Sequence, residues 1–275
     1  MTTVAVRQGR VKNLKIEKEG EFKLPPDSIA TKFPGYKIHP LYEMGVETKL
    51  LCQLTMIEPG KQKCHDHAGE NFLYIVEGEG EYFVDNNKTI PVKAGDFCHA
   101  MPFEPHGIKC LSSASKPIKY LAIEWMPRDV PRPATPITAR HEGRVKNIDI
   151  EKEGQFKHPM PDYPFVGYSG HSLIAGSNTE FLCNIARIQP GTYKNHSHQP
   201  ENFMVILEGE GEYFVDEQNS IPVKAGDICH AKAFEPHGIR CLVSASKPIK
   251  YLVIEGPRVD NPTAPMQQYT GLPNK

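Results

Sequence analysis

Six histidines in two matching stretches carry the clearest signal for chemistry in the sequence. HDHAGENFLYIVEGEGEYFVD begins at His65 and HSHQPENFMVILEGEGEYFVD begins at His196. Side chains two residues apart on a β-strand point to the same face, so each H-x-H pair directs two imidazoles to one side. A further histidine follows a Gly-Asp turn in each copy. Three convergent imidazoles, present twice, predict metal sites rather than hydrogen-bonded core histidines. The predicted ligands are His65, His67 and His106 in the first copy and His196, His198 and His237 in the second.

The histidines belong to an internal duplication that covers most of the chain. GRVKNLKIEKEGEFK from Gly9 returns as GRVKNIDIEKEGQFK from Gly143, and EGEGEYFVD, IPVKAGD, FEPHGI and SASKPIKYL each occur twice. From the first histidine onward, corresponding residues stand 131 positions apart, as His65 and His196 do. Each copy is far longer than a solenoid repeat, so each is expected to form its own core.

The segments that must position the histidines have the pattern of strands. Apolar runs that begin at Leu50 and Phe181 end in Pro-Gly turns. NFLYIVEGEGEYFVD predicts two strands joined as a hairpin at Gly78 and Gly80. No apolar stripe has both a 3.6-residue period and helical length. We therefore predict an all-β chain that contains two tandem barrels.

Prolines indicate where the copies separate. Pro127, Pro131, Pro133 and Pro136 occur within a short stretch, and such spacing excludes a regular strand or helix and favours an extended connector. We predict an N-terminal domain over residues 1–126, a Pro-rich linker over 127–142, a C-terminal domain over 143–257 and a polar tail over 258–275.

The composition limits the partners and the compartment. A formal net charge of −1 over 275 residues gives no field that would attract nucleic acid or a membrane surface. No apolar run approaches the roughly 20 residues of a membrane helix, and the first residues lack the features of a signal peptide. The sequence has seven cysteines but no CxxC motif. This pattern is typical of cysteines buried on strands in a reducing compartment. We expect a cytoplasmic protein that binds neither nucleic acid nor membranes.

These motifs resemble those of the cupin family, and the duplication resembles a two-domain bicupin. The resemblance covers nearly the whole chain. It implies two β-barrels of the double-stranded β-helix, or jelly-roll, type, with one divalent metal inside each. The matching residues of the first copy are Gly60, His65, His67, Gly78, Gly95, Asp96, Pro105 and His106, and those of the second are Gly191, His196, His198, Gly209, Gly226, Asp227, Pro236 and His237.

The chain departs from the family at the glutamate of the first motif. The expected position holds Asn71 or Asn202, and the glutamates Glu70 and Glu201 stand one residue earlier. A shift of one residue on a strand turns a side chain to the opposite face. Either the asparagine amide lies beside three histidines, the interpretation we favour, or a bulge turns the glutamate inward as a fourth ligand.

The resemblance also suggests an activity. A three-histidine site without a certain carboxylate is similar to that of the family's Fe(II) dioxygenases, which cleave carbon–carbon bonds of enol, phenol or diketone substrates. It therefore implies a metal-dependent enzyme that acts on a small oxygen-bearing organic molecule, with Fe(II) favoured over Mn, Zn or Ni. A non-redox decarboxylase, lyase or isomerase is the alternative, and a non-catalytic metal-binding or ligand-binding cupin is the second alternative. Family barrels pair through their β-faces, so homo-oligomers are compatible with the sequence.

Several residues around the second H-x-H pair differ from those around the first, and two of these differences could affect substrate binding. Tyr193 and Arg187 replace Gln62 and Met56. Tyr193 and Arg187 could bind an anionic or phenolic substrate oxygen. The competing interpretation is that both are outward residues of a barrel strand.

A histidine and a glutamate near the third histidine also recur in both copies. His99 and His230 could transfer protons, or could be hydrogen-bonded strand residues. Glu104 and Glu235 precede the third histidine on a loop. Each glutamate could act as a general acid or base, or could be a turn carboxylate.

Overall fold

The chain forms two compact units, each built of antiparallel strands. The computed structural model describes residues 10–14, 22–85, 87–127, 130–134, 145–147, 156–157, 165–174, 179–257 and 267–268. One unit comprises residues 17–151, and the other comprises residues 1–16 together with 152–275. The all-β prediction is confirmed. Among the described residues, no helix is long and apolar enough to cross a membrane.

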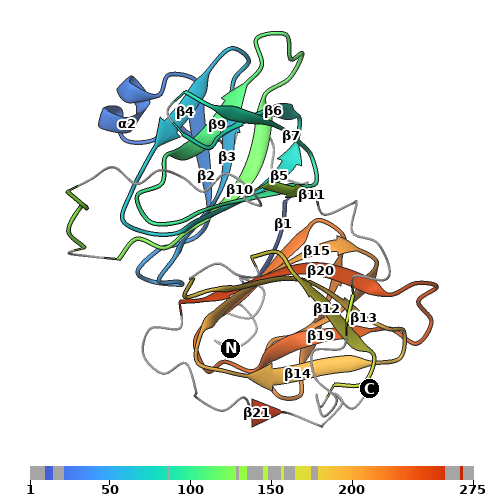
Figure 1. The fold of residues 1–275 in the computed structure, drawn as a ribbon. Helices are drawn as coiled ribbons and strands as arrows, with labels where there is room; N and C mark the ends of the chain where they lie inside the picture. Colours follow the sequence, from blue (N-terminus) through green and yellow to red (C-terminus); the bar gives the residue numbers. More distant parts are fainter. Residues whose placement is uncertain are drawn as a thin grey trace. The chain divides into compact units, whose positions relative to one another are not determined.

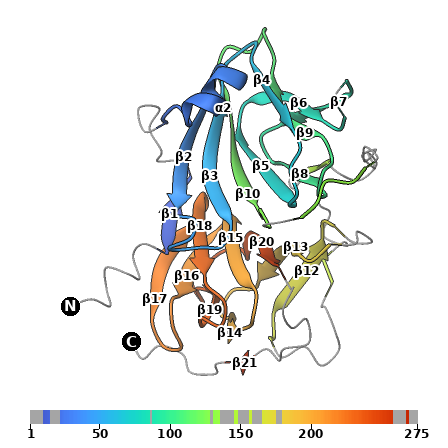
Figure 2. The same ribbon diagram turned by 90° about the vertical axis from the view of Figure 1, so that its left-hand side faces the viewer.

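The N-terminal unit is a jelly roll of two sheets that enclose one core (Figure 1). One sheet has the order β11-β8-β5-β10-β3-β2 and the other β4-β9-β6-β7, and Figure 2 shows β2, β3, β10 and β5 side by side. Leu73 and Tyr120 of the first sheet pack in the same cluster as Tyr82 and Ile108 of the second. The strands are β2 (Tyr36–Tyr42), β3 (Leu51–Ile57), β4 (Gln62–His65), β5 (Asn71–Glu77), β6 (Glu79–Phe83), β7 (Thr89–Lys93), β8 (Asp96–Ala100), β9 (His106–Cys110), β10 (Ile118–Glu124) and β11 (Val145–Asn147).

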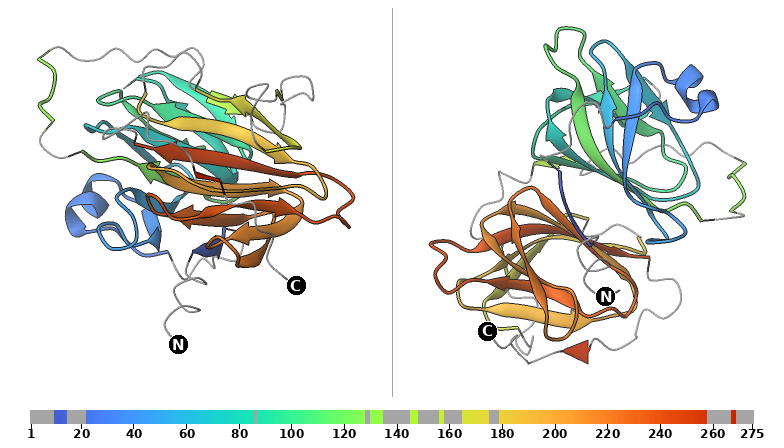
Figure 3. Two further views of the ribbon diagram at one scale, coloured as in Figure 1. Left: turned by 90° about the horizontal axis from the view of Figure 1, so that it is seen from below. Right: turned by 180° about the vertical axis from the view of Figure 1, so that it is seen from behind.

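The C-terminal unit repeats this arrangement. Its sheets have the orders β1-β18-β15-β20-β13-β12 and β17-β16-β19-β14-β21, and Figure 3 shows its orange and red strands from below and from behind. The core cluster again contains residues of both sheets, with Met204 and Tyr251 from one and Tyr213 and Ile239 from the other. The strands are β1 (Val11–Asn13), β12 (Tyr168–Ser172), β13 (Leu182–Ile188), β14 (Tyr193–Ser197), β15 (Glu201–Glu208), β16 (Glu210–Phe214), β17 (Ser220–Lys224), β18 (Asp227–Ala231), β19 (His237–Cys241), β20 (Ile249–Gly256) and β21 (Gln267–Gln268).

The leading strand of each sequence copy joins the sheet of the other copy. β1, from the first GRVKN segment, pairs with β18, whereas β11, from the second, pairs with β8. The compact units therefore do not begin and end where the two sequence copies do. Residues 135–142 of the expected linker, and most of the expected tail over 258–275, lie outside the described residues.

The predicted hairpin at Gly78 is wrong. β5 pairs with β8 and β10, whereas β6 pairs with β7 and β9. Gly78, at φ +87°, turns the chain from one sheet to the other, so consecutive strands lie on opposite walls. Local sequence does not distinguish this crossing from a hairpin, because both need the same glycine-rich turn.

A short helix, α2 (Asp27–Lys32), was also not predicted. It has Asp27 in its first turn, and a negative charge there is favourable at a helix start. Its six residues include no buried side chain. A helix with no apolar face leaves no periodic pattern in the sequence.

A close approach of β4 and β9 depends on Gly107. This residue has φ +135°, and a Cβ atom there would lie 1.9 Å from the carbonyl oxygen of Lys63. Gly238 has the same role between β14 and β19, where a Cβ would lie 1.7 Å from the carbonyl oxygen of Lys194. The missing side chain allows the strands that carry the histidines to pair.

We expect Gly107→Ala to lower the free energy of unfolding by more than about 3 kcal/mol, because it combines an unfavourable φ with a backbone clash. Gly45→Ala is the matched control, since Gly45 has φ +87° but nothing within 4 Å of an added Cβ. It should cost roughly 1–2 kcal/mol, the penalty of a left-handed conformation alone. Urea unfolding of both variants provides the comparison, and equal losses would contradict the proposed clash.

Candidate metal centres

The structure brings the three predicted histidines of the first copy together. His65 ends β4 and lies directly opposite His106, the first residue of β9. Ring centroids are 4.5 Å apart for His65 and His106, 4.8 Å for His67 and His106, and 5.5 Å for His65 and His67. One ring nitrogen from each histidine lies within 4.8 Å of the others. Such a group can surround one metal ion.

The second copy has the same arrangement. His196 of β14 lies opposite His237 of β19, with ring centroids 4.5 Å apart. His198 lies 4.6 Å from His237 and 5.1 Å from His196 by the same measure. The Nε2 atoms of His198 and His237 are 3.1 Å apart, a separation expected of two nitrogens about 2.0–2.1 Å from a common ion.

Burial keeps the central histidines neutral. His106 and His237 are fully buried, and burial lowers the pKa of each to about 3. Burial also lowers the pKa of His65 and His196, and the positive charges of Lys63 and Lys194 lower each further. A neutral imidazole has the lone pair that a metal requires, so these four histidines do not have to release protons near pH 7.

Several ring nitrogens at these sites are buried without a hydrogen-bond partner. They are His65 Nδ1, His67 Nε2, His106 Nε2 and His196 Nδ1. A buried polar atom that makes no hydrogen bond is costly in a folded protein. Coordination of a transition metal would satisfy these atoms, so the residues present fit a divalent ion.

The loop before the third histidine orients that ring. Nδ1 of His106 lies 2.7 Å from the carbonyl oxygen of Glu104, and Nδ1 of His237 lies 2.7 Å from that of Glu235. Because a carbonyl only accepts, each Nδ1 carries the proton and each Nε2 keeps its lone pair. The loop is tied to the second histidine as well, since the N–H of Phe103 donates to the carbonyl of His67 over 2.7 Å.

The second histidine has different partners in the two units. Nδ1 of His67 accepts a hydrogen bond of 3.2 Å from the N–H of Gly69, which places the proton of the neutral ring on Nε2. The corresponding residue of the second copy is Pro200, which has no N–H. Nδ1 of His198 instead lies 3.1 Å from the carbonyl oxygen of Pro200, so it donates and leaves Nε2 as an acceptor.

Asn71 begins β5, and the side chain of Glu70, the residue before it, has different partners. Asn71 lies on the same face of the strand as Leu73 and Ile75, which pack in the core. Both polar atoms of its side chain are buried without a hydrogen bond. Glu70 Oε2 lies 2.9 Å from Nε2 of His99. In the second copy Asn202 has the parity of core residues on β15, and Glu201 Oε2 lies 3.1 Å from Nε2 of His230. The asparagines therefore share the inner face with the triads.

A carboxylate that the sequence motifs did not indicate lies beside each triad. Glu124 Oε2 is 3.7 Å from Nε2 of His67, and Glu255 Oε2 is 3.3 Å from Nε2 of His198. Glu124 is the last residue of β10 and Glu255 the last but one of β20. They stand directly opposite Asn71 and Asn202. The available signal was their recurrence 131 residues apart in IEW and IEG, but nothing local connects the last strand to the histidines.

A lysine on the inner face was also missed. Lys63 and Lys194 stand two residues before the H-x-H pairs, so K-x-H-x-H alternates along each strand. Lys63 is only 8% exposed. Burial lowers the pKa of Lys194 to about 8, although the carboxylate of Glu255 opposes the shift.

The two residues expected to distinguish the second site do not lie on its inner face. Tyr193 is adjacent to Lys194 on β14, so the two side chains point to opposite faces. The ring centroid of Tyr193 lies 6.1 Å from that of Phe214. Arg187 alternates with the core residues Ala186 and Ile188 of β13, and its guanidinium stacks 3.6 Å from the ring centroid of Phe156.

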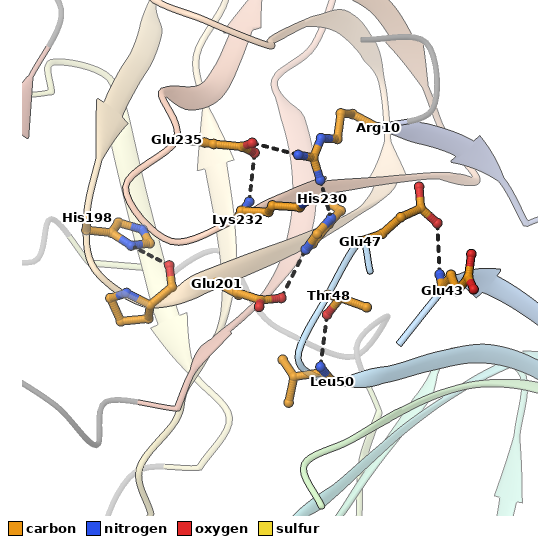
Figure 4. A network of polar contacts seen from close by, with 11 residues as sticks. Arg10, Glu43, Glu47, Thr48, Leu50, His198, Glu201, His230, Lys232 and Glu235 are labelled. Atoms are coloured by element: carbon orange, nitrogen blue, oxygen red, sulfur yellow. Dashed lines mark hydrogen bonds and ion pairs between the residues drawn. The ribbon is translucent and has the colours of Figure 1, made fainter. Parts of the chain in front are cut away.

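The remaining candidates form polar networks around the third histidine. In Figure 4, Arg10 contacts Nδ1 of His230 at 2.9 Å and Glu235 Oε1 at 2.6 Å. Glu235 Oε2 also accepts the N–H of Lys232 over 2.8 Å. Glu104 accepts the N–H of Met101 over 2.9 Å in the first copy. These contacts hold the loop on which the third histidine stands.

Comparison with known proteins identifies the repeated segment. The Cupin domain family matches residues 53–124 and 184–255, which together are just over half of the chain. The oxalate-binding protein of Thermotoga maritima is 40% identical over 60 residues, which cover 22% of this chain and 47% of that relative. The alignment thus spans about half the length of this curated relative.

Solved structures share the fold over most of the chain. A variant of salicylate 1,2-dioxygenase from Pseudoaminobacter salicylatoxidans in complex with gentisate has a TM-score of 0.65 at 14% identity, with 95% of this chain and 86% of that chain covered. The oxalate decarboxylase of Lactobacillus farciminis in a formate complex has a TM-score of 0.54 at 14% identity, with 94% and 88% covered. At 14% identity, the similarity to these structures shows a shared fold and nothing further.

We expect the C-terminal site to bind Co(II) about two- to tenfold more tightly than the N-terminal site. Metal binding at Nε2 of His67 must break the hydrogen bond from Gly69, at a cost of about 0.5–1.5 kcal/mol. The comparison uses chelator competition on His106→Ala, which retains the C-terminal triad, and on His237→Ala, which retains the N-terminal one.

Pro200→Ala in the His106→Ala background is the matched variant, because it restores an N–H at residue 200. Pro200→Ala should narrow the difference in Co(II) affinity between the two sites. A tighter N-terminal site, or no effect of Pro200→Ala, would contradict the role assigned to this residue.

Proposed function

The chain belongs to the cupin family, and we propose that it is a metal-dependent bicupin enzyme that acts on a small oxygen-bearing organic molecule. The observation that carries the proposal is the pair of convergent histidine triads, among which four buried ring nitrogens, three in the first triad and one in the second, make no hydrogen bond. If a metal served only to stabilise the fold, one histidine triad could be lost as readily as both could be kept. Both copies have all three histidines, which favours a use for both metals.

The three histidines of each unit would hold the ion, with the carboxylate of Glu124 or Glu255 beside them. Imidazoles suit Fe(II), Zn and Ni, and an added carboxylate also suits Mn(II). When bound, the ion would polarise a chelating substrate and, as Fe(II), would allow dioxygen chemistry. The triads lie next to apolar clusters that contain residues such as Ile108 and Ile239, and these walls would exclude water from the reacting groups.

Within this proposal, oxidative carbon–carbon cleavage by an Fe(II) dioxygenase is the preferred reaction. The nitrogen-rich donor set supports it, and so does the likeness of fold to salicylate 1,2-dioxygenase over 95% of the chain. Non-redox decarboxylase or lyase chemistry is the second candidate. The observation that favours it is the glutamate 3.3 Å from His198 and 3.7 Å from His67, since a carboxylate among imidazoles suits Mn(II).

Elemental analysis of protein purified without oxygen tests the proposal. We expect about two metal atoms per chain in the wild type and about one in each of His106→Ala and His237→Ala, because each substitution removes one fully buried ligand. Iron would direct the next step to oxygen-uptake assays, whereas manganese, zinc or nickel would favour the non-redox candidate. No stoichiometric metal, unchanged by either substitution, would refute the metalloenzyme proposal.

A further inference from the structure

An arginine near the start of the chain lies beside the loop of the C-terminal metal centre. Arg10 directly precedes β1, the strand that the first sequence copy contributes to the C-terminal unit. Its backbone carbonyl accepts the N–H of His230 over 3.0 Å, and its side chain is only 12% exposed. Arg10 therefore belongs to the unit that holds His237, although most of its own sequence copy forms the other unit.

The guanidinium of Arg10 bridges a strand and a loop of this unit (Figure 4). Nη1 lies 2.9 Å from Nδ1 of His230 on β18, and Nη2 donates to Glu235 Oε1 over 2.6 Å. Because arginine only donates, Nδ1 of His230 accepts, and the proton of the neutral ring is on Nε2, 3.1 Å from Glu201 Oε2. Burial lowers the pKa of His230, which agrees with a neutral ring. The guanidinium thus ties Glu235 to a buried strand.

Glu235 connects this bridge to the third histidine. Its backbone carbonyl lies 2.7 Å from Nδ1 of His237 and accepts the proton there, which leaves the lone pair of the ring on Nε2. The second carboxylate oxygen of Glu235 accepts the N–H of Lys232 over 2.8 Å. The side chain and backbone of one residue therefore join Arg10 to a metal ligand. A displaced carboxylate would move the carbonyl that orients the ring.

The same loop contains a strained residue that needs support from its surroundings. Phe234 has φ +62°, a conformation that is unfavourable for a bulky side chain. Its side chain is 62% exposed, so packing of the ring offsets little of the strain. The N–H of Phe234 donates to the carbonyl of His198 over 2.8 Å, which links the loop to the second ligand. Strained residues persist where surrounding contacts determine their conformation, and the ion pair of Arg10 with the neighbouring Glu235 is such a contact.

From these contacts we infer that Arg10 is a positioning residue of the C-terminal metal centre, so that a segment of the first sequence copy completes the site of the second. The inference rests on the proposed function, because it concerns the ion that this triad would hold. Arg10 acts through Glu235 on the orientation of His237 and is not itself a ligand. An arginine suits this role, since its rigid fork can bind an imidazole and a carboxylate at once.

The competing interpretation is that Arg10 only attaches β1 to its sheet. A second side-chain contact of β1 lies at the other end of the strand, where Nδ2 of Asn13 donates to Asp227 Oδ1 over 2.5 Å. Asn13→Ala removes that contact and leaves the ion pair on the loop in place. A role limited to strand attachment predicts that both substitutions affect metal binding alike, whereas the inference predicts an effect of Arg10 alone.

The test measures Co(II) binding by chelator competition in the His106→Ala background, which retains the C-terminal triad. In Arg10→Met we expect the dissociation constant to rise about three- to tenfold, less than the roughly 10- to 100-fold typical of a group that contacts a metal ligand directly. Arg10→Lys should lose less, because its ammonium keeps the charge but lacks the fork. Asn13→Ala should change the constant less than about twofold, as expected of an independent site. The visible absorption of bound Co(II), which reports the arrangement of its ligands, should change in Arg10→Met and not in Asn13→Ala.

The N-terminal triad, measured in the His237→Ala background, is the internal control and should bind Co(II) equally with and without Arg10→Met. Failure of both backgrounds to bind Co(II) would refute the proposed function, and failure of the C-terminal triad alone would overturn the inference. Binding that Arg10→Met leaves unchanged, or that Asn13→Ala or the N-terminal control weakens equally, would also overturn it. If Arg10→Met does not fold, Arg10→Lys decides. A wild-type constant in that variant contradicts the inference, and a raised constant confined to the C-terminal triad supports it.

Discussion

The pairing of two strands across each unit is the constraint on which the candidate sites depend. His65 and His106 are adjacent because β4 and β9 pair in a register that places the two residues opposite each other. That pairing needs backbone contact too close for a side chain at Gly107. A shift of one residue would turn the histidines of one strand to the other face and separate the ligands. The glycine after the third histidine is therefore as necessary to the site as the ligands themselves.

The same strand pairing places other chemistry on the inner face. Alternation along β4 and β14 puts a lysine in line with the histidines, while alternation along β10 and β20 puts Glu124 and Glu255 beside Asn71 and Asn202. The carboxylate that the first motif lacks thus has a counterpart on the next strand of the sheet. Each site therefore has three imidazoles, one carboxylate and one lysine on the same face.

The sequence predicted the parts of this arrangement that follow from short-range pattern. The all-β class, the duplication and the two triads depend on repeats and on spacing within a few residues. The crossing between sheets at Gly78, the exchange of β1 and β11, and the positions of Glu124 and Glu255 depend on which strands pair. Pairing partners lie tens of residues apart along the chain, and strand propensity carries no information about them. The lysines were predictable in principle, because K-x-H-x-H already shows the alternation that directs them inward.

The two copies differ in the hydrogen bonds that orient their candidate metal-binding histidines. Pro200 in place of Gly69 removes an N–H donor and so changes which nitrogen of the second histidine carries the proton. The ligand residues themselves are the same in both copies, so a comparison of motifs alone does not reveal this difference. Hydrogen bonds around the ligands, rather than the ligands, distinguish the units.

Anomalous scattering from a crystal of protein loaded with Co(II), measured on both sides of the cobalt absorption edge, is the most direct test of this account. We predict one edge-dependent peak in each unit, about 2.0–2.2 Å from ring nitrogens of all three histidines. A peak bound by fewer than three of these histidines, or no edge-dependent peak at either triad, would contradict it.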